Sequence, residues 1–413
     1  METVKMNIPK LRFPEFSEEW KSQLLNDIAT FSKGKNISKA DIVENGETEC
    51  IRYGELYTNY NEIINEVVSK TNIPRSELVL SKKNDIIIPS SGETQIDIAK
   101  ASCVMKDNVA LGGDLNIIRT KKNGIFISYY LNNKRKKEIA SLAQGNSVVH
   151  LYSNQLKGLH LNLPELPEQQ KIASFLTSFD TKIEQLTKKK SLLEKYKKGF
   201  MQQIFSQQLR FKDEKGNDYP EWDEKKLGEI GEFKNGINKG KNDFGFGVPF
   251  INLMDVFGKS TISDLNLDLV NANEKELEQY ELKKGDVLFI RSSVKKSGVG
   301  ETSVVLKDLK NTVYSGFLIR FRDDKIGFDL NYKKYCFSYR KFRQDLISLS
   351  TTSANTNINQ ESLNELKIQI PCISEQIKIG KFLDAIDLKI ELVNTQIANT
   401  QQFKKGLLQQ MFV

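Results

Sequence analysis

The stretch PELPEQQKIASFLTSFDTKIEQLTKKKSLLEKYKKGFMQQIF (Pro164–Phe205) decides the architecture of this chain, because it occurs twice. The second copy is PCISEQIKIGKFLDAIDLKIELVNTQIANTQQFKKGLLQQMF (Pro371–Phe412), and it aligns without a gap at an offset of 207 residues. When both copies are extended back to Leu156 and Leu363, about 19 of 50 aligned positions are identical. Self-similarity of this extent indicates an internal repeat.

Each copy predicts one long helix. Apolar residues recur at alternating steps of three and four, which is the spacing of a coiled-coil seam. In the first copy they are Ile172, Leu176, Phe179, Ile183, Leu186, Leu193, Phe200 and Ile204, and in the second Ile379, Leu383, Ile386, Ile390, Val393, Ile397, Leu407 and Met411. The polar interruptions of the seam are Lys190, Lys197, Thr400 and Lys404. About 36 helical residues make a rod about 55 Å long. A narrow apolar stripe cannot bury itself alone, so we expect the two helices to form an antiparallel coiled coil, which a partner subunit's helices can also join.

Length, charge and cysteine content bound the class of protein. A chain of 413 residues predicts two or three domains, and its formal charge of +8 permits a nucleic-acid partner without requiring one. Four cysteines lie far apart without a CxxC pair, which argues against a zinc site or a disulfide framework and for a reducing compartment. No apolar run reaches membrane-spanning length, and the amino terminus lacks a signal-peptide core. We therefore expect a cytoplasmic protein with no membrane contact.

The repeat extends beyond the helices. Leu-Arg-Phe, then Pro-Glu and Trp, then Phe and Gly recur in the same order in 11–37 and 209–241, with Trp20 matching Trp222 and Gly34 matching Gly236. KNDIIIPSSGE (83–93) parallels KGDVLFIRSSV (284–294), and both predict a turn, a buried strand and a polar loop. The order is cyclic, so the amino-terminal segment should form a strand near the end of the second helix, around Phe412.

The segments outside the helices predict an α+β (mixed α/β) fold. Short strand-like runs, such as 313–321, alternate with Gly, Asn and Ser turns and with helical stretches such as 332–349. The expected domains are recognition domain 1 (1–163), a central helical region (164–206), recognition domain 2 (207–370) and a second helical region (371–413). Gly199 and Gly406 recur near the helix ends and lower helix propensity, so we expect close backbone approach at a helix crossing or a subunit contact.

This arrangement resembles the specificity subunits of type I restriction-modification systems over essentially the whole chain. The resemblance is most specific where each helical region begins, at LNLPELPEQQKIASFL and IQIPCISEQIKIGKFL, a strand ending in Pro and then Glu-Gln and Ile before a long helix. The family's Gly-Asp-Ile/Val-Leu before a Ser/Gly loop is kept at 285–288 as Gly-Asp-Val-Leu. It is replaced at 84–87 by Asn-Asp-Ile-Ile.

Catalytic motifs are missing from the sequence. There is no phosphate-binding G-x-x-x-x-G-K-[ST] loop, no Asn/Asp-Pro-Pro-Tyr run for holding a flipped adenine, and no Pro-Asp…Glu-x-Lys nuclease pattern. Only two histidines, His150 and His160, are present, which excludes most metal or triad constellations. We therefore expect no catalytic residues, no metal and no cofactor.

Candidate DNA contacts are basic, amide and hydroxyl residues in loops that follow strands, because Arg, Asn and Gln read base edges while Lys neutralises phosphate. In the first unit they are Lys33, Lys35, Arg52, Tyr53, Ser90, Ser91, Gln95, Asn146 and His150. In the second they are Lys234, Asn235, Lys239, Lys241, Asn252, Arg291, Ser292, Lys295, Lys296, Asn355 and Asn357. Surface loops are rich in these residue types for ordinary reasons too.

The resemblance implies a non-catalytic DNA-specificity subunit that reads a bipartite, asymmetric target through two recognition domains held apart by a helical spacer. It implies three kinds of partner: double-stranded DNA, two methyltransferase (modification) subunits, and restriction (translocase-nuclease) subunits. S-adenosylmethionine and the active site would belong to the methyltransferase. The alternative is a coiled-coil adaptor whose two duplicated modules bind proteins, and salt-dependent DNA binding separates the two hypotheses.

Overall fold

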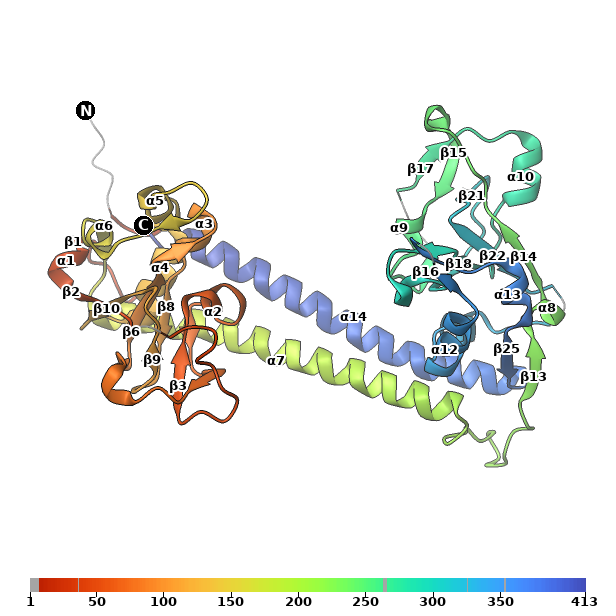
Figure 1. Cartoon of the computed structure of the whole chain (residues 1–413), viewed down its shortest axis with the longest axis horizontal. Helices are drawn as coiled ribbons and strands as arrows, with labels where there is room; N and C mark the ends of the chain where they lie inside the picture. Colours follow the sequence, from red (N-terminus) through yellow and green to blue (C-terminus); the bar gives the residue numbers. More distant parts are fainter. Residues whose placement is uncertain (1–6, 36, 263–265, 325, 353) are drawn as a thin grey trace. The chain divides into compact units, whose positions relative to one another are not determined.

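The computed structural model describes residues 7–35, 37–262, 266–324, 326–352 and 354–413 (Figure 1). The chain divides into two compact units. Unit 1 combines 1–187 with 395–413, whereas unit 2 is the continuous stretch 188–394. Both units are mixed α/β, as expected. In the described part of the chain, no helix is both long and apolar enough to cross a bilayer.

The main sheet has the same strand order in both units. In unit 1 the order is β2-β10-β6-β8-β4, and in unit 2 it is β14-β22-β18-β20-β16. The strands of unit 1 are β2 (Ala29–Lys33), β10 (Leu115–Thr120), β6 (Asp85–Pro89), β8 (Ser102–Val104) and β4 (Ile63–Ile64). Those of unit 2 are β14 (Glu232–Asn235), β22 (Leu318–Arg322), β18 (Val287–Ile290), β20 (Thr302–Val305) and β16 (Thr261–Ile262). Neighbours are antiparallel except for the parallel outer pairs β4–β8 and β16–β20. The central strands β6 and β18 are buried along their whole length, which explains their continuous apolar runs.

Smaller sheets and short helices complete each unit. In unit 1 the remaining elements are β1 (Lys21–Leu24), β3 (Thr48–Ile51), β5 (Ser69–Thr71), β7 (Ser91–Gly92), β9 (Ala110–Leu111), β11 (Val149–His150), β12 (His160–Leu163), α1 (Leu25–Ile28), α2 (Tyr53–Thr58), α3 (Gln95–Ile98), α4 (Gly124–Asn133), α5 (Lys136–Leu142) and α6 (Ser153–Lys157). In unit 2 they are β13 (Asp223–Lys226), β15 (Phe244–Ile251), β17 (Asp268–Val270), β19 (Ser292–Ser293), β21 (Val313–Tyr314), β23 (Thr351–Thr352), β24 (Thr356–Asn357), β25 (Lys367–Ile370), α8 (Leu227–Ile230), α9 (Leu253–Val256), α10 (Glu274–Tyr280), α11 (Leu330–Cys336), α12 (Arg340–Ser348) and α13 (Gln360–Glu365).

Two expected segments are divided in the structure. The run 313–321 is two strands, β21 and β22, because the chain turns at 315–317 with a hydrogen bond from Leu318 N to Ser315 O (2.9 Å). The stretch 332–349 is two helices, α11 and α12, which both bury apolar side chains such as Tyr335 and Phe342 in one core. A single straight helix would present only one stripe to that core.

The repeated stretches form the long helices α7 (Leu166–Phe205) and α14 (Ile373–Gln410). The predicted seam residues are buried or half-buried, and most of the positions between them are exposed. In unit 1, Phe179 of α7 packs on Phe403 of α14 with ring centroids 5.6 Å apart. In unit 2, Phe200 packs on Phe382 (5.2 Å).

Two of the three seam lysines form ion pairs across the two helices, whereas Lys190 pairs with Glu194 of its own helix. In unit 1, Lys404 contacts Asp180 at 2.5 Å, and in unit 2 Lys197 contacts Asp387 at 2.6 Å. Because Lys197 meets Asp387 while Phe200, further along α7, meets the earlier residue Phe382, the helices run antiparallel there. The antiparallel pairing expected from the sequence is confirmed within unit 2.

A buried glutamate begins each long helix. Glu168 is 2% exposed and accepts hydrogen bonds from Arg12 Nε (2.7 Å) and Trp20 Nε1 (3.3 Å). Glu375 is 0% exposed and accepts in the same way from Arg210 Nη2 (2.8 Å) and Trp222 Nε1 (2.9 Å). These pairs explain why Arg, Trp and Glu recur together in the sequence, since a buried carboxylate must be paired.

The glutamine that follows each glutamate ties the helix to the recognition part of the same unit. Gln169 donates to Pro164 O (2.8 Å) and accepts from Asn123 N (3.0 Å), just before α4. Gln376 donates to Pro371 O (2.9 Å) and accepts from Asp329 N, just before α11. The Glu-Gln pair is therefore a structural joint.

The amino-terminal segment lies at the end of α14, as the cyclic repeat predicts. Leu11 N donates to Gln410 O at 3.0 Å, and the Trp20 ring lies 6.4 Å from that of Phe412. The segment has no strand before β1, however, so this part of the expectation is wrong for residues 7–20.

The helix glycines do not mark a close approach within the chain. A Cβ placed on Gly199 or Gly406 meets no described atom within 4 Å apart from the neighbouring backbone of its own helix. The expectation of a helix crossing at these positions is therefore wrong, and the alternative of a subunit contact stays a prediction.

We predict that Leu383→Ala and Leu388→Ala differ sharply in stability although both lie on α14. Leu383 is 0% exposed and belongs to the core of unit 2, whereas Leu388 is 57% exposed. Truncation of a buried leucine costs about 2–5 kcal/mol, and an exposed substitution stays within about 0.5 kcal/mol. Urea unfolding of the purified chain measures both, and equal midpoints would contradict the packing described.

Candidate nucleic-acid interface

The ends of several strands meet at one edge of each main sheet. In unit 1 the residues after β2 lie against the turn between β9 and β10, because Lys35 N donates to Leu111 O (2.9 Å). A Cβ on Gly34 would lie 1.9 Å from Gly112 O, so only glycine fits between these two backbone segments. Gly236 has the same place in unit 2, where a Cβ would lie 2.2 Å from Ser315 O. The matched glycines hold the same edge together in both units.

The edge of unit 1 gathers several of the candidate DNA contacts. Ser91 Oγ lies 3.2 Å from His150 Nδ1, and β7 pairs with β11 at these two residues. Lys33 extends over the ring of Tyr152 with its Nζ 5.5 Å from the centroid. Arg52 is next to the same turn, since a Cβ on Gly112 would be 3.4 Å from Arg52 Cα. Residues from four separate stretches therefore meet on one face.

Other candidates in unit 1 are held differently. Ser90 is buried, and its backbone N–H donates to Asp114 O (2.8 Å). Gln95 Nε2 donates to the carbonyl of Ala143 at 3.4 Å. Tyr53 packs against Tyr57 with centroids 6.3 Å apart and is partly exposed. Asn146 and Lys35 are exposed, so both are open to a ligand.

The edge of unit 2 is centred on Arg291. Its backbone N–H donates to Phe317 O (2.8 Å), and its Nη1 donates to Gly316 O (3.3 Å). Ser292 pairs with Asn357 between β19 and β24, in the way that Ser91 pairs with His150 in unit 1.

The asparagines of unit 2 have local roles as well. Asn252 caps α9, because its Oδ1 accepts from Leu253 N at 2.8 Å. Asn357 donates to Asn355 O at 3.1 Å. Asn235 ends β14 directly before Gly236, so it belongs to the same edge.

The lysine candidates of unit 2 fall into two groups. Lys239 makes an ion pair with Glu276 at 2.7 Å, and its hydrogen bond lowers the pKa of that carboxyl group. Lys234 reaches Gln279 (3.4 Å) and lies over the ring of Tyr280, so it points toward α10. The exposed lysines are Lys241, Lys295 and Lys296. Only this second group is available to neutralise phosphate without breaking a contact.

Three residues at these edges were not anticipated from the sequence. Asp114 and Tyr152 belong to the edge of unit 1, and Phe317 belongs to that of unit 2. The sequence does contain a pattern from which Asp114 and Phe317 could have been found. The turns LGGDL (111–115) and YSGFL (314–318) each place one residue that differs between the units between a Gly and the Leu of a buried strand.

The edge of unit 1 has the residue types of a catalytic triad without its geometry. Ser91 Oγ lies between His150 Nδ1 (3.2 Å) and Asp114 Oδ1 (3.3 Å). In a triad the histidine lies between the other two. Burial raises the pKa of the Cys50 thiol to about 11, which disfavours its thiolate. Among the described residues, no cluster of three or more His, Cys, Asp or Glu side chains is arranged to hold a metal.

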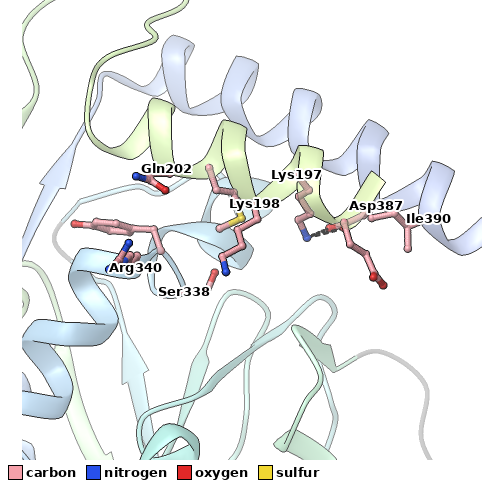
Figure 2. A pocket seen from close by; sticks show the side chains of 10 residues that line it. Lys197, Lys198, Gln202, Ser338, Arg340, Asp387 and Ile390 are labelled. Carbon is pink, nitrogen blue, oxygen red and sulfur yellow. Dashed lines mark hydrogen bonds and ion pairs between the residues drawn. The ribbon is translucent and has the colours of Figure 1, made fainter. Parts of the chain in front are cut away.

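One cavity lies beside the long helices in unit 2. Figure 2 shows Lys197 and Lys198 of α7 on one side and Ser338 and Arg340 on the other. Lys197 is held there by its ion pair with Asp387. This cavity belongs to the packing of α12 against the helices and contains none of the candidate DNA contacts.

Comparison with known proteins agrees with the doubled fold. A family model described as the type I restriction modification DNA specificity domain matches residues 17–195 and again 219–401. The chain belongs to this family and carries its domain twice.

Named relatives span nearly the whole chain. The specificity subunit of the type I restriction enzyme MjaVIII from Methanocaldococcus jannaschii is 27% identical, with 96% of this chain and 92% of the relative aligned. The EcoKI specificity subunit from Escherichia coli K12 is 20% identical over 92% of this chain and 85% of its own length. The crystal structure of the type I restriction-modification S subunit from M. genitalium has the same fold, with a TM-score of 0.59, 16% identity and coverage of 98% and 99%.

We predict that Lys35→Gln weakens DNA binding and lowers its salt dependence. Lys35 is exposed at the edge of unit 1, so its loss should reduce the slope of log K against log salt by about one phosphate contact. The matched control is Lys239→Gln, because Lys239 is already paired with Glu276. Fluorescence anisotropy with a labelled duplex at several salt concentrations measures both. An unchanged slope for Lys35→Gln would remove this residue from the interface.

Proposed function

We propose that the chain is the DNA-recognition subunit of a type I restriction-modification complex and reads a bipartite, asymmetric target. The observation that carries the proposal is that the two units share a framework but differ at their edges. Arg119 Nε donates to the buried Asp85 at 2.7 Å in unit 1, and Arg322 Nε donates to the buried Asp286 at 2.7 Å in unit 2.

Several residues at equivalent edge positions are chemically different. The equivalences follow from strand register and from the matched glycines. Between unit 1 and unit 2, the pairs are Lys33 and Asn235, Arg52 and Asn252, Ser90 and Arg291, and His150 and Asn357. Side chains with different donors and acceptors on one scaffold are expected of two modules that read different base sequences.

The helices α7 and α14 are proposed to set the spacing between the two recognised blocks and to bind the methyltransferase subunits. Each helix contributes residues to both units, which supports the first role. Large apolar side chains remain exposed on α7 and α14 in unit 2, which supports the second: Leu192, Tyr196, Leu388 and Leu392. We place the recognition domains at 1–163 and 207–370 and the helical regions at 164–206 and 371–413.

The partners proposed are those of a complete type I system. Specificity subunits of this family act together with modification and restriction subunits and bind DNA; two methyltransferase copies per chain would match the doubled architecture. In such a complex, S-adenosylmethionine would be bound by the methyltransferase subunits. A cytoplasmic location would follow from the DNA target. A protein-binding adaptor is the alternative function, and salt-dependent, sequence-selective DNA binding distinguishes the two.

The test is an exchange of residues 15–160 for the equivalent segment of another family member. In cells that carry the exchanged subunit with its methyltransferase, the methylated sites should change in one block and keep both the other block and the spacer. Sequencing of methylated genomic sites measures the result. A chain that rewrote both blocks at once would show that the units do not read independently.

A complementary variant carries four extra residues after Lys190 and leaves both recognition domains unaltered. Four helical residues add about 6 Å. The same sequencing should show a longer spacer between two unchanged blocks. Altered blocks with an unchanged spacer would contradict the role assigned to the helices.

We predict that the purified chain alone transfers no methyl group, cleaves no DNA and hydrolyses no ATP. The measurement is incubation with duplex DNA and tritiated S-adenosylmethionine, with the methyltransferase added in a parallel reaction as the positive control. Incorporation of label without the partner would refute a pure recognition role.

A further inference from the structure

One turn occupies the same place at the edge of both units but carries a charged side chain in one unit and an apolar side chain in the other. It joins β9 to β10 in unit 1 and β21 to β22 in unit 2, and its variable residue is Asp114 or Phe317. The backbone of this residue is held identically, since Ser90 N donates to Asp114 O and Arg291 N donates to Phe317 O, both at 2.8 Å. Asp114 and Phe317 are therefore structural equivalents.

Both side chains face solvent at the edge where the candidate DNA contacts meet. Asp114 is exposed, and its Oδ1 accepts from Ser91 Oγ at 3.3 Å. Among the described residues, no donor contacts its Oδ2. Phe317 is 58% exposed and follows Gly316, whose carbonyl accepts from Arg291. The turn thus presents a carboxylate oxygen in one unit and an apolar ring in the other.

Neither side chain suits a phosphate-binding role. A carboxylate on a basic edge repels the DNA backbone, and a phenyl ring offers it no hydrogen bond. Both suit base edges in the major groove, where a carboxylate accepts from the N4 amino group of cytosine and an apolar side chain contacts the thymine methyl group. A carboxylate at such an edge lowers the affinity for most DNA sequences. The affinity is kept only for sequences that place the cytosine amino group within reach of the carboxylate.

We propose that Asp114 and Phe317 are base-discriminating residues: Asp114 selects a cytosine in one block of the target and Phe317 selects a thymine in the other. This inference rests on the proposed function, because it assigns base readers within the same two edges. It also explains why the two turns differ, because equivalent positions then specify different bases. Arg291, held beside Phe317, is placed to read a neighbouring base pair.

The test uses the full chain assembled with the methyltransferase subunits of its own system. The complex selects from a library of randomised duplexes, and the bound DNA is sequenced. Asp114→Asn keeps the shape and the contact with Ser91 but adds a donor, and Phe317→Ala removes the ring. Lys35→Gln and Lys295→Gln serve as controls, because both remove the charge of an exposed lysine at one edge and leave the sequence of both turns unaltered.

Each turn variant should change the preference at one position of one block by about tenfold. Asp114→Asn should lose the preference for cytosine, and Phe317→Ala should lose that for thymine. The other block should keep its sequence, which also shows that the complex is folded. The lysine controls should weaken binding to all sequences alike and leave both blocks as they are.

The failure of this proposal is distinct from failure of the proposed function. If the unaltered complex selects two defined blocks and the two turn variants select the same blocks without any change, Asp114 and Phe317 do not read bases. A change at both blocks, or only a uniform loss of affinity, would overturn the proposal as well. If the unaltered complex selects no sequence, the recognition function itself is wrong.

Discussion

The buried carboxylate at the start of each long helix is the constraint on which the rest of the structure depends. Glu168 and Glu375 lie out of reach of solvent, so each needs a cation that comes from the segment before the recognition fold. Removing one partner of such a pair leaves an uncompensated buried charge, which is strongly destabilising. The pair therefore fixes where a helix begins relative to its sheet, and a neighbouring glutamine extends the joint to the next helix of the unit. Loss of either partner at this joint would therefore weaken the connection between the helix and the recognition part of its unit.

The same reasoning explains why one part of the repeat is preserved and another has diverged. Buried charges such as Asp85 and Asp286 have partners with a fixed geometry, so the residues on both sides of each pair are constrained. A glycine is constrained where a backbone segment passes within contact distance, as at Gly34 and Gly236. Side chains at the exposed edge are not constrained by such contacts. They are free to differ between the units, and this difference is the basis for the proposal that the two edges read different bases.

Much of this could be anticipated from the sequence, because a repeat reports on long-range structure that propensities miss. The constant offset identified both helices and their seam, and the cyclic order placed Leu11 beside the end of α14. What could not be anticipated depends on contacts between distant residues. Lys239 is of a residue type that contacts phosphate, but in the structure it forms an ion pair with Glu276 of α10. The turn at Phe317 lies inside an apolar run that reads as one strand. Gly199 was misjudged because a glycine's sequence context does not show whether any atom lies beside it.

The contact between the amino-terminal segment and the end of α14 has a consequence for biosynthesis. Unit 2 is continuous in sequence, so all of its residues have been made once Asn394 is added. The first part of unit 1 is synthesised before unit 2, yet its core includes Leu407, Met411 and Phe412, which follow unit 2 in the sequence. Trp20 and Phe126 therefore lack the aromatic contact with Phe412 until all of unit 2 has been synthesised. Domains generally fold in order of synthesis, but here unit 1 starts before unit 2 and is completed after it, so the apolar side chains that contact Phe412 stay uncovered while unit 2 is made.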